Sequence, residues 1–381
     1  MTFIENPVYV LAVLCLMVIL ASYAGKTKLG GKLGAALLVI LFTAVIANLK
    51  LIPSASNSIP LYSGIFTYLA PISIFYLLLN VNLQSIKKAG APMIILFLIG
   101  SLATVLGILA AWYLIAPEEI LGENANIIAG MLTGTYTGGS VNFNAVALEY
   151  DFQEKGALYA GTIAVDNVVT AAWIIINILF PVVLRTFWKD KKIETKVTNE
   201  TKDEEEEEED RMDFTSLIWL LFLGIAAFYI SELIGLWLPS VPFILILSTL
   251  GILMAQIPLI SNLKGSHTLG LYLIFLFLAV IGAYCEISAV VELKEVGWTL
   301  FLFTSLAVLI HGVVIILLGG ISFRDWEMVA IASQANIGGS SSAIALAESF
   351  KRKELILPGI LVGTLGNALG TYLGFLMVGL L

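Results

Sequence analysis

Two short stretches of this sequence place glycines beside amide and hydroxyl side chains inside otherwise apolar segments. The first reads GTYTGGSVNFNA over residues 134–145, and the second reads QANIGGSSSAIA over residues 334–345. Consecutive glycines let a helix break at small cost, which frees N–H groups at one end and carbonyls at the other. Freed N–H groups favour a carboxylate, whereas carbonyl, hydroxyl and amide oxygens suit sodium. We therefore expect the two stretches to form one binding site.

The candidate ligands are glycines that allow close approach and side chains that are almost all uncharged and polar. Glycine and serine are also common where membrane helices pack, but that explains one such stretch better than two at matching positions. The residues expected to bind a solute are Thr135, Thr137, Gly138, Gly139, Ser140, Asn142, Gly338, Gly339, Ser340, Ser341 and Ser342. The residues expected to bind an ion are Thr133, Asn144, Asp166, Asn167, Gln334, Asn336 and Asn367.

Asp166 is the one acid deep inside a predicted membrane span, in the segment IAVDNVVTAAW. A buried carboxylate is costly in a membrane and by default indicates an ion or proton site that faces the protein interior. The alternative is a neutral, hydrogen-bonded acid that ties helices together. Asn167 and Asn367 either bind ions or link helices in the same way, and His311 is best interpreted as a structural histidine.

Composition indicates an integral membrane protein. Hydrophobic residues make up 59% of the chain and charged residues 13%. The net charge of −8 carries little information, because the acidic run 203–210 accounts for it. The sequence has no basic patch interleaved with aromatic residues, so we do not expect the protein to bind nucleic acid. We find no nucleophile–base pair, phosphate loop or metal-ligand spacing, so we do not expect an enzyme or a cofactor. The one ion that we expect the protein to use is sodium, as the coupling ion.

Ten apolar segments are long enough to cross about 30 Å of hydrocarbon, five in each half of the chain. They are residues 7–23, 33–50, 61–80, 91–115, 156–186, 214–237, 240–258, 268–286, 296–319 and 355–381. The glycine-bearing stretches 125–149 and 326–349 are additional to these ten. Irregular backbone at membrane depth is tolerated only where it lines protein or a water-filled cavity, so we expect both stretches to be broken or re-entrant.

The charges of the loops indicate how these two stretches lie in the membrane, because cytoplasmic loops are rich in Lys and Arg. The basic loops 26–32 and 87–88 are expected inside, and the acidic loop 118–123 outside. The basic segments 185–192 and 351–353 are also inside if both stretches enter and leave on one side. Two full crossings would instead leave these strongest basic signals outside.

The resulting prediction is an all-α polytopic membrane protein built from two inverted-topology repeats. The first repeat covers residues 1–186 and the second covers residues 214–381, and their broken segments enter from opposite faces. Residues 187–213 are expected to form an acidic, disordered cytoplasmic linker, because they are highly charged and lack apolar periodicity.

With these motifs in hand, the chain resembles the YjcL-like family, domain of unknown function 819. The resemblance covers nearly the whole chain, most specifically TYTGGSVNFNA, AVDNV, QANIGGSSSA and GTLGNALG. That family is grouped with the bile-acid/sodium symporter and cation/proton antiporter superfamily. The chain is more loosely similar to glutamate/sodium and citrate/sodium symporters, from which it departs in the Ser-Val-Asn and Ser-Ser-Ser that follow its glycines. The resemblance implies a core domain that moves against a scaffold domain, and a homodimer.

The leading functional hypothesis is a secondary transporter in the cell inner (cytoplasmic) membrane, surrounded by lipid. It would couple sodium to symport of a small carboxylated solute, such as an amino acid, dipeptide or organic acid, by alternating access. One alternative is a cation/proton antiporter that uses Asp166. Another is a non-transporting membrane scaffold or receptor that docks partners through the acidic linker.

Overall fold

All regular secondary structure is helical in the residues that the computed structural model describes, which are 3–27, 30, 34–191, 212–285 and 294–381. Within these ranges eight helices are long and apolar enough to cross a membrane. They are α1 (Pro7–Gly25), α4–η3–α5 (Pro60–Leu78), α7 (Ala91–Ile115), α11 (Gly156–Phe187), α13 (Phe214–Trp237), α16 (Ser266–Tyr284), α18 (Lys294–Ser322) and α21 (Ile356–Leu380). The prediction of a polytopic helical membrane protein is confirmed.

Two of the ten predicted spans are shorter helices, α3 (Ala35–Asn48) and α14 (Phe243–Met254). Their sequences are apolar, but α14 starts only after Pro242 and has 12 residues. Three lysines of the loop-charge prediction, Lys28, Lys32 and Lys192, and most of the acidic linker lie outside the described residues.

Local sequence explains where the helices begin and how they meet lipid. The side chain of Asn6 accepts a hydrogen bond from the N–H of Val8 at 2.9 Å, so α1 is capped directly before its proline at Pro7. Large apolar side chains remain exposed at the ends of other helices, as at Trp237, which is 85% exposed. Such surfaces are stable only against lipid or another protein.

Each predicted broken segment is a pair of short helices that folds back on itself. The first hairpin consists of α9 (Ala125–Gly138) and α10 (Ser140–Glu149), and the second of α19 (Trp326–Ile337) and α20 (Gly339–Ser349). A Cβ atom on Gly134 would lie 3.1 Å from Cβ of Asn142. In the second hairpin, Nε2 of Gln334 lies 3.1 Å from Oγ of Ser342. Gly134 and Asn142 are equally far from Gly138 in the sequence, and Gln334 and Ser342 are equally far from Gly338. The tips of the hairpins therefore lie at Gly138–Gly139 and Gly338–Gly339.

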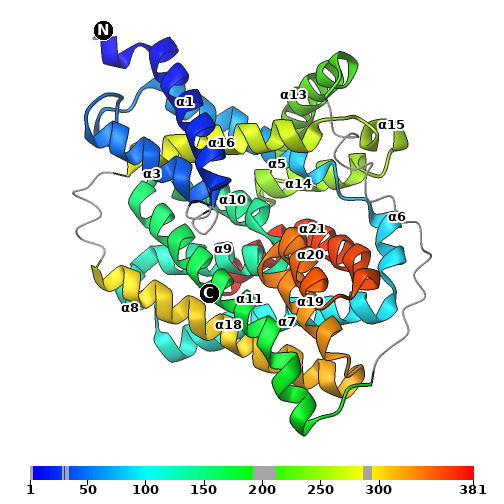
Figure 1. Cartoon of the computed structure of the whole chain (residues 1–381). Helices are drawn as coiled ribbons and strands as arrows, with labels where there is room; N and C mark the ends of the chain where they lie inside the picture. Colours follow the sequence, from blue (N-terminus) through cyan, green and yellow to red (C-terminus); the bar gives the residue numbers. More distant parts are fainter. Residues whose placement is uncertain (1–2, 28–29, 31–33, 192–211, 286–293) are drawn as a thin grey trace.

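The helices form two groups, which Figure 1 shows one above the other. The upper group contains α1, α3, α5, α13, α14 and α16, where α16 packs on α3 and α5 and α13 packs on α14. The lower group contains α7, α11, α18, α21 and the two hairpins, where α18 packs on α7 and α21 on α9. The first three spans of each half therefore lie in one group, and the later elements of each half lie in the other.

Candidate functional site

The tips of the two hairpins meet one turn of α21. A Cβ atom on Gly138 would lie 1.9 Å from the carbonyl carbon of Gly366, and one on Gly363 would lie 2.7 Å from the backbone nitrogen of Ser340. Only glycine permits backbones to approach so closely. Because residues three apart share a face of a helix, the two tips lie within one turn of α21 of each other.

The second helix of each hairpin begins at this meeting point without a side-chain cap. Gly139 precedes α10 and Gly338 precedes α20, and neither helix start receives a side-chain hydrogen bond from its N-cap residue. Gly139 has φ 105° and Gly339 has φ 75°, a left-handed backbone that favours glycine. The first N–H groups of a helix have no partner within the helix, so both tips present donors and positive helix ends to the same region.

Several of the predicted ligands in the first hairpin are occupied by protein hydrogen bonds. Asn142 donates to the carbonyl of Gly366 at 3.3 Å and accepts from the hydroxyl of Thr371 at 2.8 Å. Asn144 accepts a hydrogen bond from the hydroxyl of Tyr159. These two asparagines therefore fix the first hairpin against α21 and α11.

The threonines of α9 are also buried. Thr133 and Thr137 donate to carbonyls one turn back in their own helix, both at 2.8 Å. Thr135 is 3% exposed. None of these three side chains faces solvent, so their contribution to a site at the tips comes mainly from the backbone.

The polar residues of the second hairpin form a buried network with α7, α11 and α18. Gln334 accepts from Nδ2 of Asn177 at 2.8 Å and donates to Ser342. The side-chain amide of Asn336 lies 3.0 Å from the hydroxyl of Ser101 and 3.4 Å from the carbonyl of Thr137 in the first hairpin. Gln334 and Asn336 thus hold the second hairpin in place, and the Asn336 side chain lies against the end of α9 in the first hairpin.

His311 lies at the centre of the same network and is fully buried. Its Nδ1 lies 3.0 Å from the hydroxyl of Thr104, which donates to the carbonyl of Tyr136, and its Nε2 lies 3.0 Å from the hydroxyl of Ser333. Ser333 also accepts from Nε1 of Trp173 at 3.1 Å. Both ring nitrogens have partners, as expected of a structural histidine.

Asp166 and Asn167 lie on α11 and are half-buried. Asp166 accepts from the hydroxyl of Thr170 at 3.3 Å and lies beside Tyr136 of the first hairpin. The hydroxyl of Tyr136 is buried and interacts with Asp166. Asp166 therefore faces the first hairpin, with the hydroxyl of Tyr136 beside it.

Half of the predicted ligands that have a side chain, seven of fourteen, remain accessible. Ser140 and Ser341 are exposed, and those that are half-buried are Asp166, Asn167, Ser340, Ser342 and Asn367. Asn367 lies near Gly139, since a Cβ atom on that glycine would lie 3.8 Å from its Oδ1. Sequence reasoning missed Ser101, Thr104, Tyr136 and Thr170, although polar residues inside the apolar helix α7 were a usable signal.

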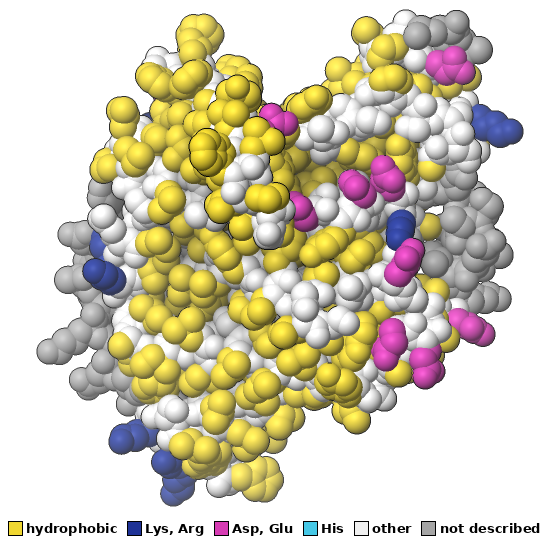
Figure 2. Space-filling model, turned by 180° about the vertical axis from the view of Figure 1, so that it is seen from behind, with side chains coloured by type: hydrophobic (Ala, Val, Ile, Leu, Met, Phe, Trp, Pro, Cys, Tyr) yellow, Lys and Arg dark blue, Asp and Glu magenta, His cyan; other side chains and the backbone are white. Residues whose placement is uncertain are grey.

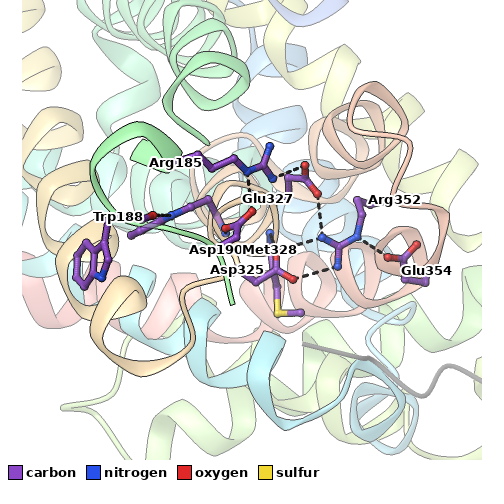
Figure 3. Close-up of polar contacts among 9 residues, drawn as sticks. Arg185, Trp188, Asp190, Asp325, Glu327, Met328, Arg352 and Glu354 are labelled. Carbon is purple, nitrogen blue, oxygen red and sulfur yellow. Dashed lines mark hydrogen bonds and ion pairs between the residues drawn. The ribbon is translucent and has the colours of Figure 1, made fainter. Parts of the chain in front are cut away.

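The open end of the second hairpin is held by ion pairs, drawn in Figure 3. Arg352 bonds Asp325 at 3.1 Å and Glu327 at 2.9 Å, and Glu327 also receives Arg185 of α11 at 2.6 Å. Burial acts to raise the pKa of Glu327, but hydrogen bonds from the two guanidinium groups outweigh it and lower the pKa below its ordinary value. The cluster ties the ends of α11, α19 and α20 together.

Comparison with known proteins places the chain in a family. It matches the family model described as "Protein of unknown function (DUF819)" over residues 9–381. It is also 28% identical over 372 residues to the "Uncharacterized membrane protein YjcL" of Bacillus subtilis (strain 168). The aligned region covers 92% of this chain and 91% of that protein. The chain therefore belongs to the DUF819 family, and the predicted resemblance to YjcL-like membrane proteins is confirmed. The wider relationship to sodium symporters and cation/proton antiporters stays a prediction.

Proposed function

We propose that this chain is a secondary active transporter that couples sodium to symport of a small carboxylated solute. The observation that carries the proposal is the meeting of two uncapped half-helix starts, at Gly139 and Gly338, on one turn of α21. Two positive helix ends and their free N–H groups suit a carboxylate. No covalent chemistry and no cofactor beyond the coupling ion are needed.

The arrangement of the hairpins supports re-entrant segments that enter from opposite faces of the membrane. The open end of the second hairpin carries the basic residues Arg324, Lys351, Arg352 and Lys353. The loops at the open end of the first carry one base, Lys155, and the acidic residues Glu118, Glu119, Glu123, Asp151 and Glu154. By the positive-inside rule the second hairpin enters from the cytoplasm and the first from outside. The repeated element order of the two halves fits inverted repeats of this kind.

Sodium would bind where oxygen atoms surround the tips. Asn367, Ser340 and Asp166 offer accessible side-chain oxygens, and the broken helix of the first hairpin ends at carbonyls close to Gly138. Hard cations prefer such oxygen ligands. The lower group of helices, which carries both hairpins, would move against the upper group and expose the site to each side in turn, in a homodimer of the inner membrane.

Uptake into proteoliposomes tests the proposal. An inward sodium gradient should drive accumulation of at least one amino acid, dipeptide or organic acid from a panel, and an equal potassium gradient should not. Ser341→Ala and Asn367→Ala should lower that uptake. Ser349→Ala, at the other end of α20, is the matched control, because its hydroxyl donates only to Leu346. Uptake that is independent of sodium, or absent for the whole panel, would reject symport.

A cation/proton antiporter is the second candidate, and the placement of Asp166 favours it. A half-buried carboxylate beside the buried hydroxyl of Tyr136 is suited to exchange of a proton for a cation. If this is correct, a sodium gradient should drive proton efflux that a pH-sensitive dye reports, and Asp166→Asn should abolish it. Under symport, Asp166→Asn should instead leave solute uptake in place or change only its ion dependence.

A further inference from the structure

A cleft of about 380 Å³ opens away from the hairpin tips, at the open end of the first hairpin. Its walls come from the end of α10, the short helix η6 (Phe152–Glu154), the α4–η3–α5 segment, α13 and α14. Figure 2 shows acidic side chains gathered around the hollow between the two lobes at the top of this face. The cleft lies between the first hairpin and the upper group of helices.

The lining of this cleft is strongly acidic. It includes Glu149, Asp151, Glu154 and Glu232, and among the residues that the structure describes no lysine or arginine lines it. Both carboxylate oxygens of Glu149 accept hydrogen bonds from the start of α14, at 3.2 Å from the backbone nitrogen of Phe243 and 3.0 Å from the next one. The other three carboxylates are exposed and lie on the open side, so the cleft attracts cations.

One buried acceptor in the wall of the cleft has no donor. Gln153 lines the cleft and is 3% exposed, and its Nε2 donates to Asp151 at 3.2 Å. Its Oε1 is buried and lacks a hydrogen-bond partner in the described residues. A buried carbonyl of this kind is normally satisfied, and a ligand N–H group would satisfy it.

Aromatic side chains form the apolar part of the lining. The rings of Phe228 and Phe243 stand edge to face with centroids 5.0 Å apart, and Phe66 belongs to the π-helical turn Ile65–Leu69. Aromatic faces attract a desolvated organic cation and pack against its carbon atoms. No group of three or more histidine, cysteine or acidic side chains is arranged to hold a metal ion in the described residues, which favours an organic cation over a metal.

We propose that this cleft binds a small organic cation that carries N–H donors, either a primary ammonium or a guanidinium, on a short apolar body. The exposed carboxylates neutralise its charge, Oε1 of Gln153 accepts one of its N–H groups, and the phenylalanine rings cover its apolar body. A volume of about 380 Å³ is in the range of small-ligand pockets. Binding here requires neither sodium nor a carboxylated solute, so it can be tested whether or not the chain proves to be a symporter.

Calorimetric titration of the full chain in lipid nanodiscs provides the test, with three probes of similar shape. Phenethylamine carries a charge and N–H donors, its N-trimethyl derivative carries only the charge, and 2-phenylethanol carries no charge. We expect phenethylamine to bind about tenfold more tightly than either other probe. Equal binding of 2-phenylethanol would show a merely apolar site. Binding of sodium or calcium chloride at the cleft, without phenethylamine binding, would also overturn the proposal.

Variants locate the binding. Glu232→Gln and Glu154→Gln change exposed side chains, so folding should be unaffected, and each should weaken phenethylamine binding about fivefold or more. Gln153→Leu should remove the preference for phenethylamine over its trimethyl derivative. Glu119→Gln changes an exposed acid on a different loop, so it is the matched control and should leave the affinity for phenethylamine unchanged. Full affinity in the double variant of Glu154 and Glu232 would refute a site in this cleft.

Discussion

Replacement of Gly138 by alanine tests the close packing of the first hairpin on α21, on which the candidate site depends. The new Cβ would lie 1.9 Å from the carbonyl carbon of Gly366, whereas ordinary contacts begin at 3.4 Å, so the two backbones must separate by about 1.5 Å. Overpacking of this kind costs about 1–3 kcal/mol. Because Gly138 is the last residue of α9, alanine there gains little of the helix propensity that it has inside a helix.

Gly161→Ala is the matched control, because Gly161 lies inside α11 with no atom within 4 Å of a Cβ placed there. Gly161→Ala gains helix propensity and meets no clash, so Gly138→Ala should be less stable than Gly161→Ala by at least about 1–3 kcal/mol. The assay is thermal unfolding in detergent. Unfolding is monitored by the reaction of a fluorogenic maleimide with Cys285, which is buried in the folded chain and becomes reactive when the chain unfolds. Gly138→Ala should unfold several degrees below Gly161→Ala.

Gly366→Ala gives an independent check, since its Cβ would lie 2.4 Å from the carbonyl oxygen of Thr137. Both variants open the same gap, so the double variant should cost less than the sum of the two. If Gly138→Ala unfolds at the same temperature as Gly161→Ala, or above it, the helices do not approach as described. The two half-helix starts would then have no reason to meet on α21.

Three further outcomes are expected from the buried polar groups. Arg352→Met should destabilise the chain by about 3–5 kcal/mol in the same unfolding assay, because buried Asp325 loses both guanidinium hydrogen bonds. Lys353→Met is the control and should change the stability little. Equal effects of the two variants would mean that the ion pairs of Arg352 do not form. The lowered pKa of Glu327 gives stability that is complete above the ordinary Glu pKa of 4.5 and is lost as the pH falls through the folded value. Unfolding temperature should therefore drop below pH 4.5, and Glu327→Gln should flatten this part of the profile; an unchanged profile would contradict the assignment. His311→Phe should cost about 2–4 kcal/mol through its two lost hydrogen bonds, while leaving the sodium dependence of any uptake unaltered; a lost sodium dependence would instead assign the histidine to the transport mechanism.

The local sequence was sufficient to predict most of the helices. Uninterrupted apolar segments must become helices in a membrane, because every backbone polar group needs a partner there. The predicted segment 91–115 is α7, and the predicted breaks at Gly138–Gly139 and Gly338–Gly339 are the tips of two hairpins. The sequence overestimated α3 and α14, since hydropathy counts apolar residues and does not register where a helix begins and ends.

The roles of the polar side chains were decided by tertiary structure. Asn142 and Asn144 have the chemistry of ion ligands, yet their partners are the carbonyl of Gly366 and the hydroxyls of Thr371 and Tyr159. An amide satisfied by a distant helix is indistinguishable in the sequence from one that faces a cavity. The order of residues along the chain thus determined that it is a helical membrane protein with two glycine breaks, because helix formation in a membrane depends on local apolar sequence and backbone hydrogen bonding. Only the packed structure determined which polar groups remain open to a ligand, because that depends on which surfaces far apart in the chain come into contact.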